Sequence, residues 1–353
     1  MELAFPTDRP ADQAPGAGIR LPAEWERHER TLMGWPCRRE LWNETIDQAR
    51  ADYATVANAI AEFEPVTMIA NPGADAAQAR AACGSRVDIV QLALNDSWLR
   101  DAGPIYVHGP EGPQAVHFRF NAWGGKFLPW DADAAVGGLI AEHLGHPVVR
   151  GPMVLEGGSI CSNGAGTIIT TEQCLLDPNR NPDLTKAQIE NVLSDFLGAE
   201  RTIWLGQGLV EDRDTDGHVD LIAAFTAADQ VLVQVVDGEN PNYENCLENR
   251  ARLVAAGIDV RELSPLAYFT VAGEAVAMSY LNFYICNGAV IAPVAGAAAG
   301  AQADADAEAL ATIAAAYPGR EVVPVPGAVL AFGGGGPHCI TQPVPAREDA
   351  PGG

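Results

Sequence analysis

The sequence has few basic residues and no long apolar runs. Lys and Arg number 22 against 46 Asp and Glu, which gives a formal net charge of −24 over 353 residues. A surface this negative repels phosphate backbones, so we expect no nucleic-acid partner. The apolar runs are short and broken by Gly, Pro or Asp, so we also expect no membrane-spanning segment.

The cysteine pattern is not that of a disulfide framework or a zinc ribbon. The seven cysteines are irregularly spaced and include no CxxC pair, and both classes depend on regular spacing. The first residues show no basic stretch followed by an apolar stretch, so no signal peptide is expected. Reduced thiols in a cytoplasmic protein are the prediction.

Strands and helices alternate in the predicted order, yet the sequence has no phosphate-binding loop. No GxGxxG or GxxxxGK motif follows a predicted strand, which argues against a nucleotide-binding sheet. A helix is expected to begin at a capping box formed by Thr185 and Gln188 and to end at Gly198. Apolar periodicity predicts further helices over 44–63, 132–144, 243–256 and 304–316, and strands that include 219–225, 283–292 and 328–332.

We expect one α/β domain over residues 20–345. The alternation of strands and helices is typical of the α/β class, and no Ser/Gly-rich linker or block of charge divides the chain. Residues 1–19 and 346–353 are rich in Pro, Ala and Gly and are expected to be flexible tails.

Four polar clusters follow apolar runs, at 95–101, 155–158, 215–220 and 333–342. Turns beside buried strands are where binding and catalytic residues are usually placed. Asp101, Glu156, His218 and Cys339 are separated by 55, 62 and 121 residues, and the last interval is close to twice 60. Five ββαβ-like modules of about 71 residues, sharing one centre, would produce this spacing. The fifth contribution would then fall near 279–283.

Cys339 is the cysteine best placed to act as a nucleophile. Four glycines at 333–336 precede it and permit close approach of the backbone. His338 and nearby backbone amides are able to help hold a thiolate. The other six cysteines are expected to be buried structural residues.

The remaining candidates are one imidazole and three carboxylates. On a strand, His218 and Asp220 would point to the same face, as an acid/base group and a cation binder. A solvent-facing polar edge is the alternative for that pair, and a turn or cap role is the alternative for Asp101 and Glu156. Together the four residues and a thiol would suit a planar cation such as a guanidinium. A metal bound by the same residues is also conceivable, but no second spaced His supports it.

The ordered motifs resemble those of the agmatine deiminases, within the guanidine-group-modifying (pentein) superfamily. The resemblance runs over about residues 20–345. It rests on Leu21-Pro-Ala-Glu-Trp-Glu, Gly34-Trp-Pro, Asn95-Asp-Ser-Trp-Leu-Arg-Asp-Ala-Gly-Pro104, Phe120-Asn-Ala-Trp-Gly-Gly125, Leu155-Glu-Gly-Gly-Ser159, Asn179-Arg-Asn-Pro182, Thr215-Asp-Gly-His-Val-Asp220, Asn282-Phe-Tyr-Ile and His338-Cys-Ile-Thr-Gln342.

The resemblance implies a five-bladed α/β propeller that needs no metal or organic cofactor. It implies that Cys339 is the nucleophile and that His218 is the general acid/base, with Glu156 beside it. It also implies that Asp101 and Asp220 hold the guanidinium. Trp98 and Trp123 would shape the substrate pocket.

The implied reaction is hydrolysis of agmatine to N-carbamoylputrescine and ammonia. The expected partner is a small cationic guanidine, and a homo-oligomer is left open. The alternatives are deimination of free or peptidyl arginine, transfer of the amidino group to an amine, and a guanidine-binding protein without activity. Gly336-Pro337 and a short stretch at 261–278 depart from the family pattern where the far end of the substrate would be read.

Overall fold

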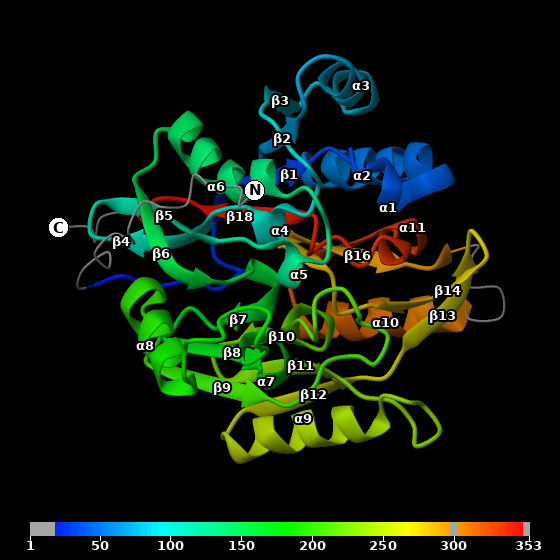
Figure 1. Cartoon of the computed structure of the whole chain (residues 1–353). Helices are drawn as coiled ribbons and strands as arrows, with labels where there is room; N and C mark the ends of the chain where they lie inside the picture. The colour runs from blue at the N-terminus through cyan, green and yellow to red at the C-terminus, as the bar shows by residue number, and fades with distance from the viewer. Residues whose placement is uncertain (1–17, 297–302, 349–353) are drawn as a thin grey trace.

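The computed structural model describes residues 18–296 and 303–348 (Figure 1). Of the predicted tails, residues 1–17 and 349–353 lie outside this part. Residues 346–348 pack against the fold, because the Ala346 amide donates to the Arg27 carbonyl at 2.8 Å and Glu348 pairs with Arg20.

Among the described residues, five sheets have the same strand order. In each, an antiparallel pair is extended by a strand that runs parallel to the second member of the pair. The strands are, in sheet order, β4 (Ile105–Gly109), β5 (Gly112–Arg119) and β6 (Val148–Val154); β7 (Ile160–Ser162), β8 (Thr167–Thr171) and β9 (Arg201–Leu205); β10 (Ala223–Ala227), β11 (Gln230–Gln234) and β12 (Asp259–Leu263); β15 (Tyr284–Cys286), β16 (Ala289–Val294) and β17 (Glu321–Pro326); and β18 (Thr341–Pro345), β1 (His28–Gly34), β2 (Val66–Ala70) and β3 (Val87–Gln91).

The first and last described strands are neighbours. β18 pairs with β1 in antiparallel fashion, with Met33 opposite Thr341. Figure 1 shows the chain passing from the blue strands at the top, through green and yellow elements, to the red strand β18 beside β1. A separate antiparallel hairpin, β13 (Leu266–Val271) and β14 (Glu274–Ser279), projects on the right of the same view.

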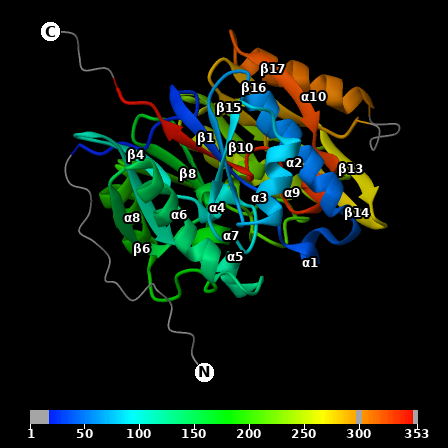
Figure 2. The same ribbon diagram turned by 90° about the horizontal axis from the view of Figure 1, so that it is seen from above.

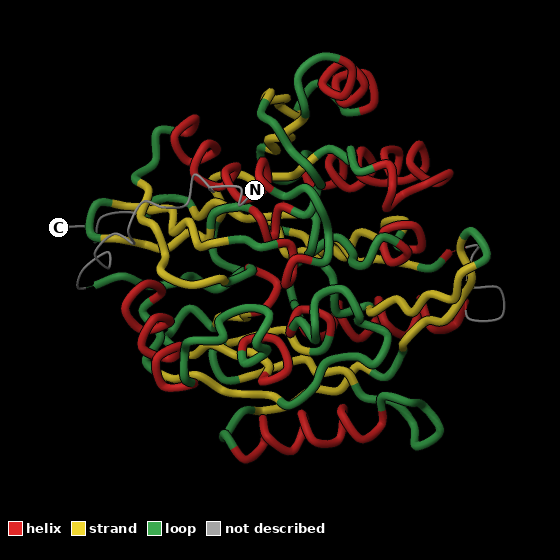
Figure 3. The backbone as a smooth tube through the Cα atoms, viewed as in Figure 1, coloured by secondary structure: helices red, strands yellow, loops and turns green. Residues whose placement is uncertain are grey.

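The longer helices cover the outside of the sheets, and two short helices lie near the centre of the view (Figures 1 and 2). Seen as a tube in Figure 3, the middle of the molecule is crossed mainly by loops and short helical turns. The helices are α1 (Arg39–Trp42), α2 (Ile46–Ile60), α3 (Ala74–Ala82), α4 (Leu99–Ala102), α5 (Ala122–Gly125), α6 (Asp131–Leu144), α7 (Glu172–Leu175), α8 (Lys186–Leu197), α9 (Tyr243–Ala255), α10 (Ala303–Ala316) and α11 (Ala328–Phe332).

Helix α8 shows why the sequence folds this way locally. The Thr185 hydroxyl accepts from the Gln188 amide and the Gln188 side chain accepts from the Thr185 amide, which confirms the predicted capping box. The helix ends at Gly198 with φ 72°, a left-handed conformation that suits Gly. Its apolar face, which includes Ile189 and Leu193, is fully buried against a sheet. Comparable buried faces on α2 and α10 place the core between the outer helices and the sheets.

Three predicted strands differ from the structure. Residues 328–332 form helix α11, because a five-residue apolar run carries no periodicity that separates a strand from one helical turn. The predicted strand 219–225 begins with a 3₁₀ turn, Val219–Leu221, before β10. The predicted strand 283–292 is a hairpin, because Gly288 with φ 88° reverses the chain between β15 and β16.

In the part of the chain that the structure covers, no helix combines the length and the hydropathy that crossing a membrane requires.

Candidate functional site

The segment that precedes the first strand of each of the five sheets carries one of the polar groups of the site. In every case the candidate residue lies a few positions before the strand. The corresponding segment of each sheet therefore supplies one side chain. The residues are Asp101 before β4, Glu156 before β7, Asp220 before β10, Asn282 before β15 and Cys339 before β18.

Side chains from two of these segments meet at Gly158, which follows Glu156 in a third. A Cβ atom at Gly158 would lie 2.6 Å from His218 Nδ1 and 2.9 Å from both Asp101 Oδ1 and Asp220 Oδ2. Real Cβ atoms do not come this close to other heavy atoms, so only Gly allows the imidazole and the two carboxylates to meet here. The Glu-Gly-Gly motif is therefore part of the site through its backbone as well as through Glu156.

Asp101 is held by donors from two other segments. The Gly158 amide donates to Asp101 Oδ1 at 2.9 Å, and Trp123 Nε1 donates to Oδ2 at 2.9 Å. Burial, together with the nearby Asp220 and Glu156, raises the pKa of Asp101. Trp123 itself has φ 53°, a left-handed conformation that is unusual for a bulky residue and is typical of functional sites. The predicted pocket residue Trp123 thus contacts the carboxylate directly.

Asp220 connects the imidazole of His338 to the thiol of Cys339. Its Oδ2 atom accepts from His338 Nδ1 at 2.8 Å and from Cys339 Sγ at 3.3 Å. Burial would raise the pKa of Asp220, but the hydrogen bond and charge of His338 and the charge of His218 lower it overall. Asp220 is therefore positioned to stay ionised inside the protein.

The Cys339 thiol is buried among groups that favour its protonated form. Burial raises the pKa of Cys339 well above its usual value, and the Asp220 and Asp101 carboxylates raise it further. The Cys339 amide donates to Asn282 Oδ1 at 3.2 Å. A Cβ atom at Gly335 would lie 2.8 Å from Cys339 Sγ and 2.8 Å from the Trp98 ring, so the glycine run makes room for both.

Glu156 is paired with a buried arginine. Arg180 Nε donates to Glu156 Oε1 at 2.6 Å, and its Nη1 donates to Asp216 Oδ2 at 2.8 Å. Both side chains of the Arg180–Glu156 pair are fully buried. This ion pair fixes one oxygen of Glu156 and leaves the other free to face a ligand.

Several buried polar atoms at this place have no hydrogen-bond partner among the described residues. They are both ring nitrogens of His218, Glu156 Oε2 and Asp220 Oδ1. Leaving such an atom unpaired costs about 1–3 kcal/mol, so a group of them calls for an explanation. A small ligand with several N–H donors would pair with the carboxylate oxygens.

Glu156 and His218, together with the nearby Cys174, form a cluster of potential metal ligands. Ligand atoms of Glu156, Cys174 and His218 lie within 4.8 Å of one another. The Arg180 guanidinium already neutralises Glu156. Burial and the charge of Glu156 raise the pKa of Cys174 well above its usual value, so this thiol is protonated. The set therefore fits a metal ion poorly, since the thiolate is the form that binds metal.

Two adjoining cavities lead to the thiol. The first is lined by Trp98, Asp101, Trp123 and Cys339, together with Asp214 and Gly334. The second, of about 470 Å³, shares Asp214 and Gly334 with the first and is bounded on one side by residues 274–277 of strand β14. The short stretch at 261–278 thus forms one wall of the larger cavity.

Charged groups around the larger cavity are mainly acidic. They are Glu211, Asp212, Asp214 and Glu274, with Arg213 as the basic lining residue. Two other basic side chains near the site are already paired. Arg100 pairs with Glu24, and Lys126 pairs with Asp216 and donates to the carbonyl groups of Arg213 and Asp214. Arg213 was not anticipated from the sequence.

The structure brings together all the residues that the sequence predicted for the site, namely Cys339, His218, Glu156, Asp101, Asp220, Trp98 and Trp123. His218 and Asp220 reach it from a 3₁₀ turn and not from a strand, so the predicted basis of that pairing was wrong. Sequence reasoning missed Arg180 and Asn282, although both lie in the quoted motifs. The interval of about 60 residues pointed to 279–283, where Asn282 lies.

Known proteins resemble this chain over nearly its whole length. Residues 20–345 match the family described as Porphyromonas-type peptidyl-arginine deiminase, and the chain belongs to this family. The agmatine deiminase of Pseudomonas aeruginosa is 39% identical over 94% of this chain and 97% of its own. That of Stutzerimonas stutzeri is 38% identical over 93% and 96%.

A solved structure shares the fold. The agmatine deiminase of Enterococcus faecalis has a TM-score of 0.88 and 32% identity, and covers 95% of this chain and 98% of its own. The predicted membership of the agmatine deiminase family, and the prediction of an enzyme, are confirmed.

Proposed function

We propose that the protein hydrolyses agmatine to N-carbamoylputrescine and ammonia through a covalent intermediate on Cys339. The observation that carries the proposal is the meeting of His218, Asp101 and Asp220 at Gly158, with the Cys339 thiol on Asp220. Buried oxygens of Asp220 and Glu156 have no hydrogen-bond partner among the described residues. A guanidinium is planar, cationic and rich in N–H donors, and so matches these acceptors. The names of the relatives support agmatine as the guanidine.

The first half of the reaction forms a bond between sulfur and carbon. Cys339 Sγ attacks the central guanidinium carbon, while Asp101 and Asp220 hold the cation against the thiol. The bond from this carbon to one terminal nitrogen breaks. The proton lost by the thiol is the one that the departing amine gains, with His218 as its carrier, so that ammonia leaves and an S-alkylthiouronium remains.

The second half returns the enzyme to its starting form. Water attacks the same carbon and gives one proton to His218, the C–S bond breaks, and sulfur recovers its proton from His218. The second proton of the water is released and converts the departed ammonia to ammonium. The product is a ureido compound, N-carbamoylputrescine when the substrate is agmatine. In each half His218 first accepts a proton and then gives it up. This suits a buried imidazole whose ring nitrogens have no hydrogen-bond partner among the described residues and whose Nδ1 lies 3.9 Å from Asp101 Oδ1.

The bound cation also activates the nucleophile. Burial and two carboxylates raise the pKa of Cys339 in the unliganded protein. A guanidinium between those carboxylates neutralises them and adds a positive charge beside the sulfur, and both changes favour the thiolate. Substrate binding and thiol ionisation are therefore coupled in this proposal.

The far end of the substrate would extend toward Asp214. This side chain lines both cavities, beside the backbone of Gly334. A carboxylate at this position suits the primary ammonium group of agmatine. Among the described residues, the acidic lining of the larger cavity supports a dicationic substrate.

A second candidate substrate is arginine. Arg213 on the larger cavity is the observation that favours it, because a guanidinium group there would pair with an α-carboxylate. Its three acidic neighbours on the same stretch oppose that role.

We further propose that the five sheets of identical strand order are the blades of a propeller, with the site at its centre. The pairing of β18 with β1 and the supply of site residues from equivalent segments support this arrangement. One catalytic domain over residues 20–345, a cytoplasmic location and an oligomer remain predictions.

The test of the proposed chemistry is a quenched turnover with agmatine. We expect substrate-derived mass on Cys339 and on no other cysteine, and complete loss of ammonia release in Cys339→Ala. Cys286→Ala is the matched control, because Cys286 is a buried thiol in strand β15 and should leave turnover unchanged. Adduct mass on another cysteine, or turnover by Cys339→Ala, would refute the assignment.

A further inference from the structure

A chain of charged contacts leads from the thiol to the side of the molecule away from the two cavities. His338 Nδ1 contacts Asp220 Oδ2 at 2.8 Å, and its Nε2 contacts Glu24 Oε1 at 2.8 Å. Arg100 Nη1 donates to the same Glu24 oxygen at 2.8 Å. Asp220 in turn accepts from Cys339 Sγ at 3.3 Å. Glu24 is therefore linked to the nucleophile through two intervening side chains.

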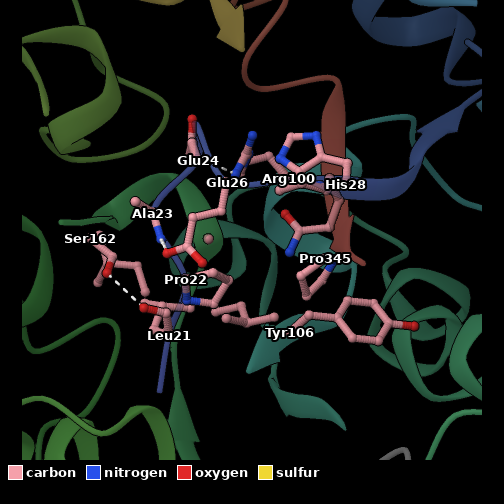
Figure 4. A pocket seen from close by; sticks show the side chains of 15 residues that line it. Leu21, Pro22, Ala23, Glu24, Glu26, His28, Arg100, Tyr106, Ser162 and Pro345 are labelled. Carbon is pink, nitrogen blue, oxygen red and sulfur yellow. Dashed lines mark hydrogen bonds and ion pairs between the residues drawn. The ribbon is translucent and has the colours of Figure 1, made fainter. Parts of the chain in front are cut away.

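Glu24 does not line the cavities that lead to Cys339. With Arg100 it lines a different cavity, shown in Figure 4, where both residues are labelled along its upper edge. The Glu24 side chain is 22% exposed, whereas that of Arg100 is 5% exposed. Glu24 also lines a small cavity with Asp220 and His338, but neither of the two cavities described at the thiol, so its role in the reaction is assigned through His338.

Arg100 contacts both His338 and Glu24. Its Nε donates to the His338 carbonyl at 3.2 Å, and its Nη1 donates to Glu24. The adjacent residue in the chain is Asp101, whose carboxylate accepts from Gly158 and Trp123. Neighbouring residues of one short helix thus contact different parts of the site.

We propose that Glu24 is a positioning residue for the reaction: it keeps His338 as an imidazolium that donates to Asp220, and so keeps Asp220 ionised and directed at the thiol and the substrate cation. The proposal rests on the function proposed above, since it assigns Asp220 a part in holding a guanidinium. It adds two residues, Glu24 and Arg100, that act through another side chain.

The electrostatics agree with this geometry. Burial and the charge of Arg100 would lower the pKa of His338, but Glu24 and Asp220 outweigh them and raise it overall. Burial would raise the pKa of Asp220, but His338 and His218 lower it overall. His338 and Asp220 therefore form a charged pair in the pH range between the lowered pKa of Asp220 and the raised pKa of His338.

Other charged and titratable groups face these residues and stay in place when Glu24 is changed. His28, Cys161 and Tyr317 face Glu24, while Asp101, His218 and Cys339 face Asp220. Arg100 faces both Glu24 and His338. Of the groups that face His338, Glu24 and Asp220 are the two that raise its pKa.

The test compares Glu24→Gln with Glu26→Gln across a pH series of kcat/KM for agmatine. Glu26 lies on the same turn and lines the same cavity, but its carboxylate contacts Arg20 and the Ala23 amide. Without Glu24 the pKa of His338 falls and that of Asp220 rises. We expect the acid limb of the Glu24→Gln profile to move to higher pH, the alkaline limb to move to lower pH, and kcat/KM to fall about tenfold near neutral pH.

The outcomes separate a positioning role from a structural one. Glu26→Gln should keep the wild-type profile, and Glu24→Asp, which retains the charge, should recover part of the loss. A fall in kcat/KM by the same factor at every pH, or an unchanged profile, would overturn the proposal.

A second measurement does not depend on activity or on the folding of a variant. The His338 imidazole in the wild-type protein is titrated by NMR, with His338→Gln to identify its signal among the seven histidines. We expect it to stay protonated above the pH at which an ordinary histidine titrates, and an ordinary or lower pKa would overturn the proposal. Failure of the wild type to release ammonia from agmatine would refute the proposed function, while this titration would still decide whether Glu24 holds His338 charged.

Discussion

At the scale of single residues, small side chains matter as much as reactive ones. Gly158 allows Asp101, His218 and Asp220 to meet, and Gly335 allows Cys339 and Trp98 to lie against the backbone. Neither glycine has a positive φ, so the requirement is space and not backbone conformation. The reactive residues depend on these positions because protein interiors are close-packed and cannot absorb an added methyl group without movement.

Gly158→Ala is expected to disable the site while the protein still folds. The added methyl would lie 2.6 Å from His218 Nδ1, so the imidazole or a carboxylate must move. A displacement of about 1 Å can cost on the order of 100-fold in rate, and we expect kcat/KM to fall by about that factor. Steady-state ammonia release measures it.

The control for this substitution is Gly238→Ala. Gly238 is exposed, and the nearest atom to an added Cβ there is Tyr243 Cζ at 4.0 Å. Its kcat/KM should equal that of the wild type. A Gly158→Ala enzyme with wild-type kcat/KM would show that the three side chains need not meet at this point.

At the scale of secondary structure, long periodic segments were predicted well and short ones were not. Helix α8 begins and ends where its capping box and Gly198 predicted, and the ends of α2 and α6 agree with the expected ranges to within three residues. Helix α11 and the hairpin of β13 and β14 were missed. A run of about five apolar residues fits either state, so its neighbours in the fold decide between strand and helix.

The capping box of α8 gives a prediction about stability alone. Thr185→Ala removes the hydroxyl that accepts from the Gln188 amide. The free energy of unfolding should fall by about 1 kcal/mol, and kcat/KM should not change because α8 lies on the outside of its sheet. Thermal or chemical unfolding measures the change.

A threonine inside a helix serves as the comparison. Thr55 lies within α2, where its hydroxyl donates to the Ala51 carbonyl and caps nothing. Thr55→Ala should cost little or nothing, since Ala favours helix interiors. Equal destabilisation by both substitutions would show that the cap itself contributes little.

At the scale of the whole molecule, the negative charge of the protein is expected to favour cationic substrates. The net charge of −24 attracts cations over long range, and four acidic residues line the larger cavity, one of which, Asp214, also lines the cavity at the thiol. Arg213 is the local exception. We therefore expect a dicationic guanidine to be favoured over one that carries a carboxylate.

This preference is measured by comparing kcat/KM for agmatine and arginine at matched ionic strength. We expect agmatine to be preferred by at least about tenfold, which corresponds to roughly 1.4 kcal/mol. Asp214→Asn should reduce the preference, because Asp214 lines both cavities. Equal values for the two substrates, together with loss of arginine turnover in Arg213→Ala, would show that Arg213 binds the α-carboxylate.

The sequence by itself determined the family, the alternation of elements and which polar residues were candidates for the site. Those features are local: motifs such as His338-Cys-Ile-Thr-Gln342 and the helix caps are encoded by neighbouring residues, and the regular interval between Asp101, Glu156 and His218 reflects a repeated strand order.

Only the tertiary structure decided which groups are paired and which remain free. Arg180 neutralises Glu156, and Glu24 reaches His338 across 314 positions of the chain, and neither contact follows from spacing. The protonation of Cys339 was likewise open, because carboxylates and a histidine act on it in opposite directions. Burial is the largest cause of the raised pKa of Cys339, and burial depends on how segments that are distant in the chain pack together.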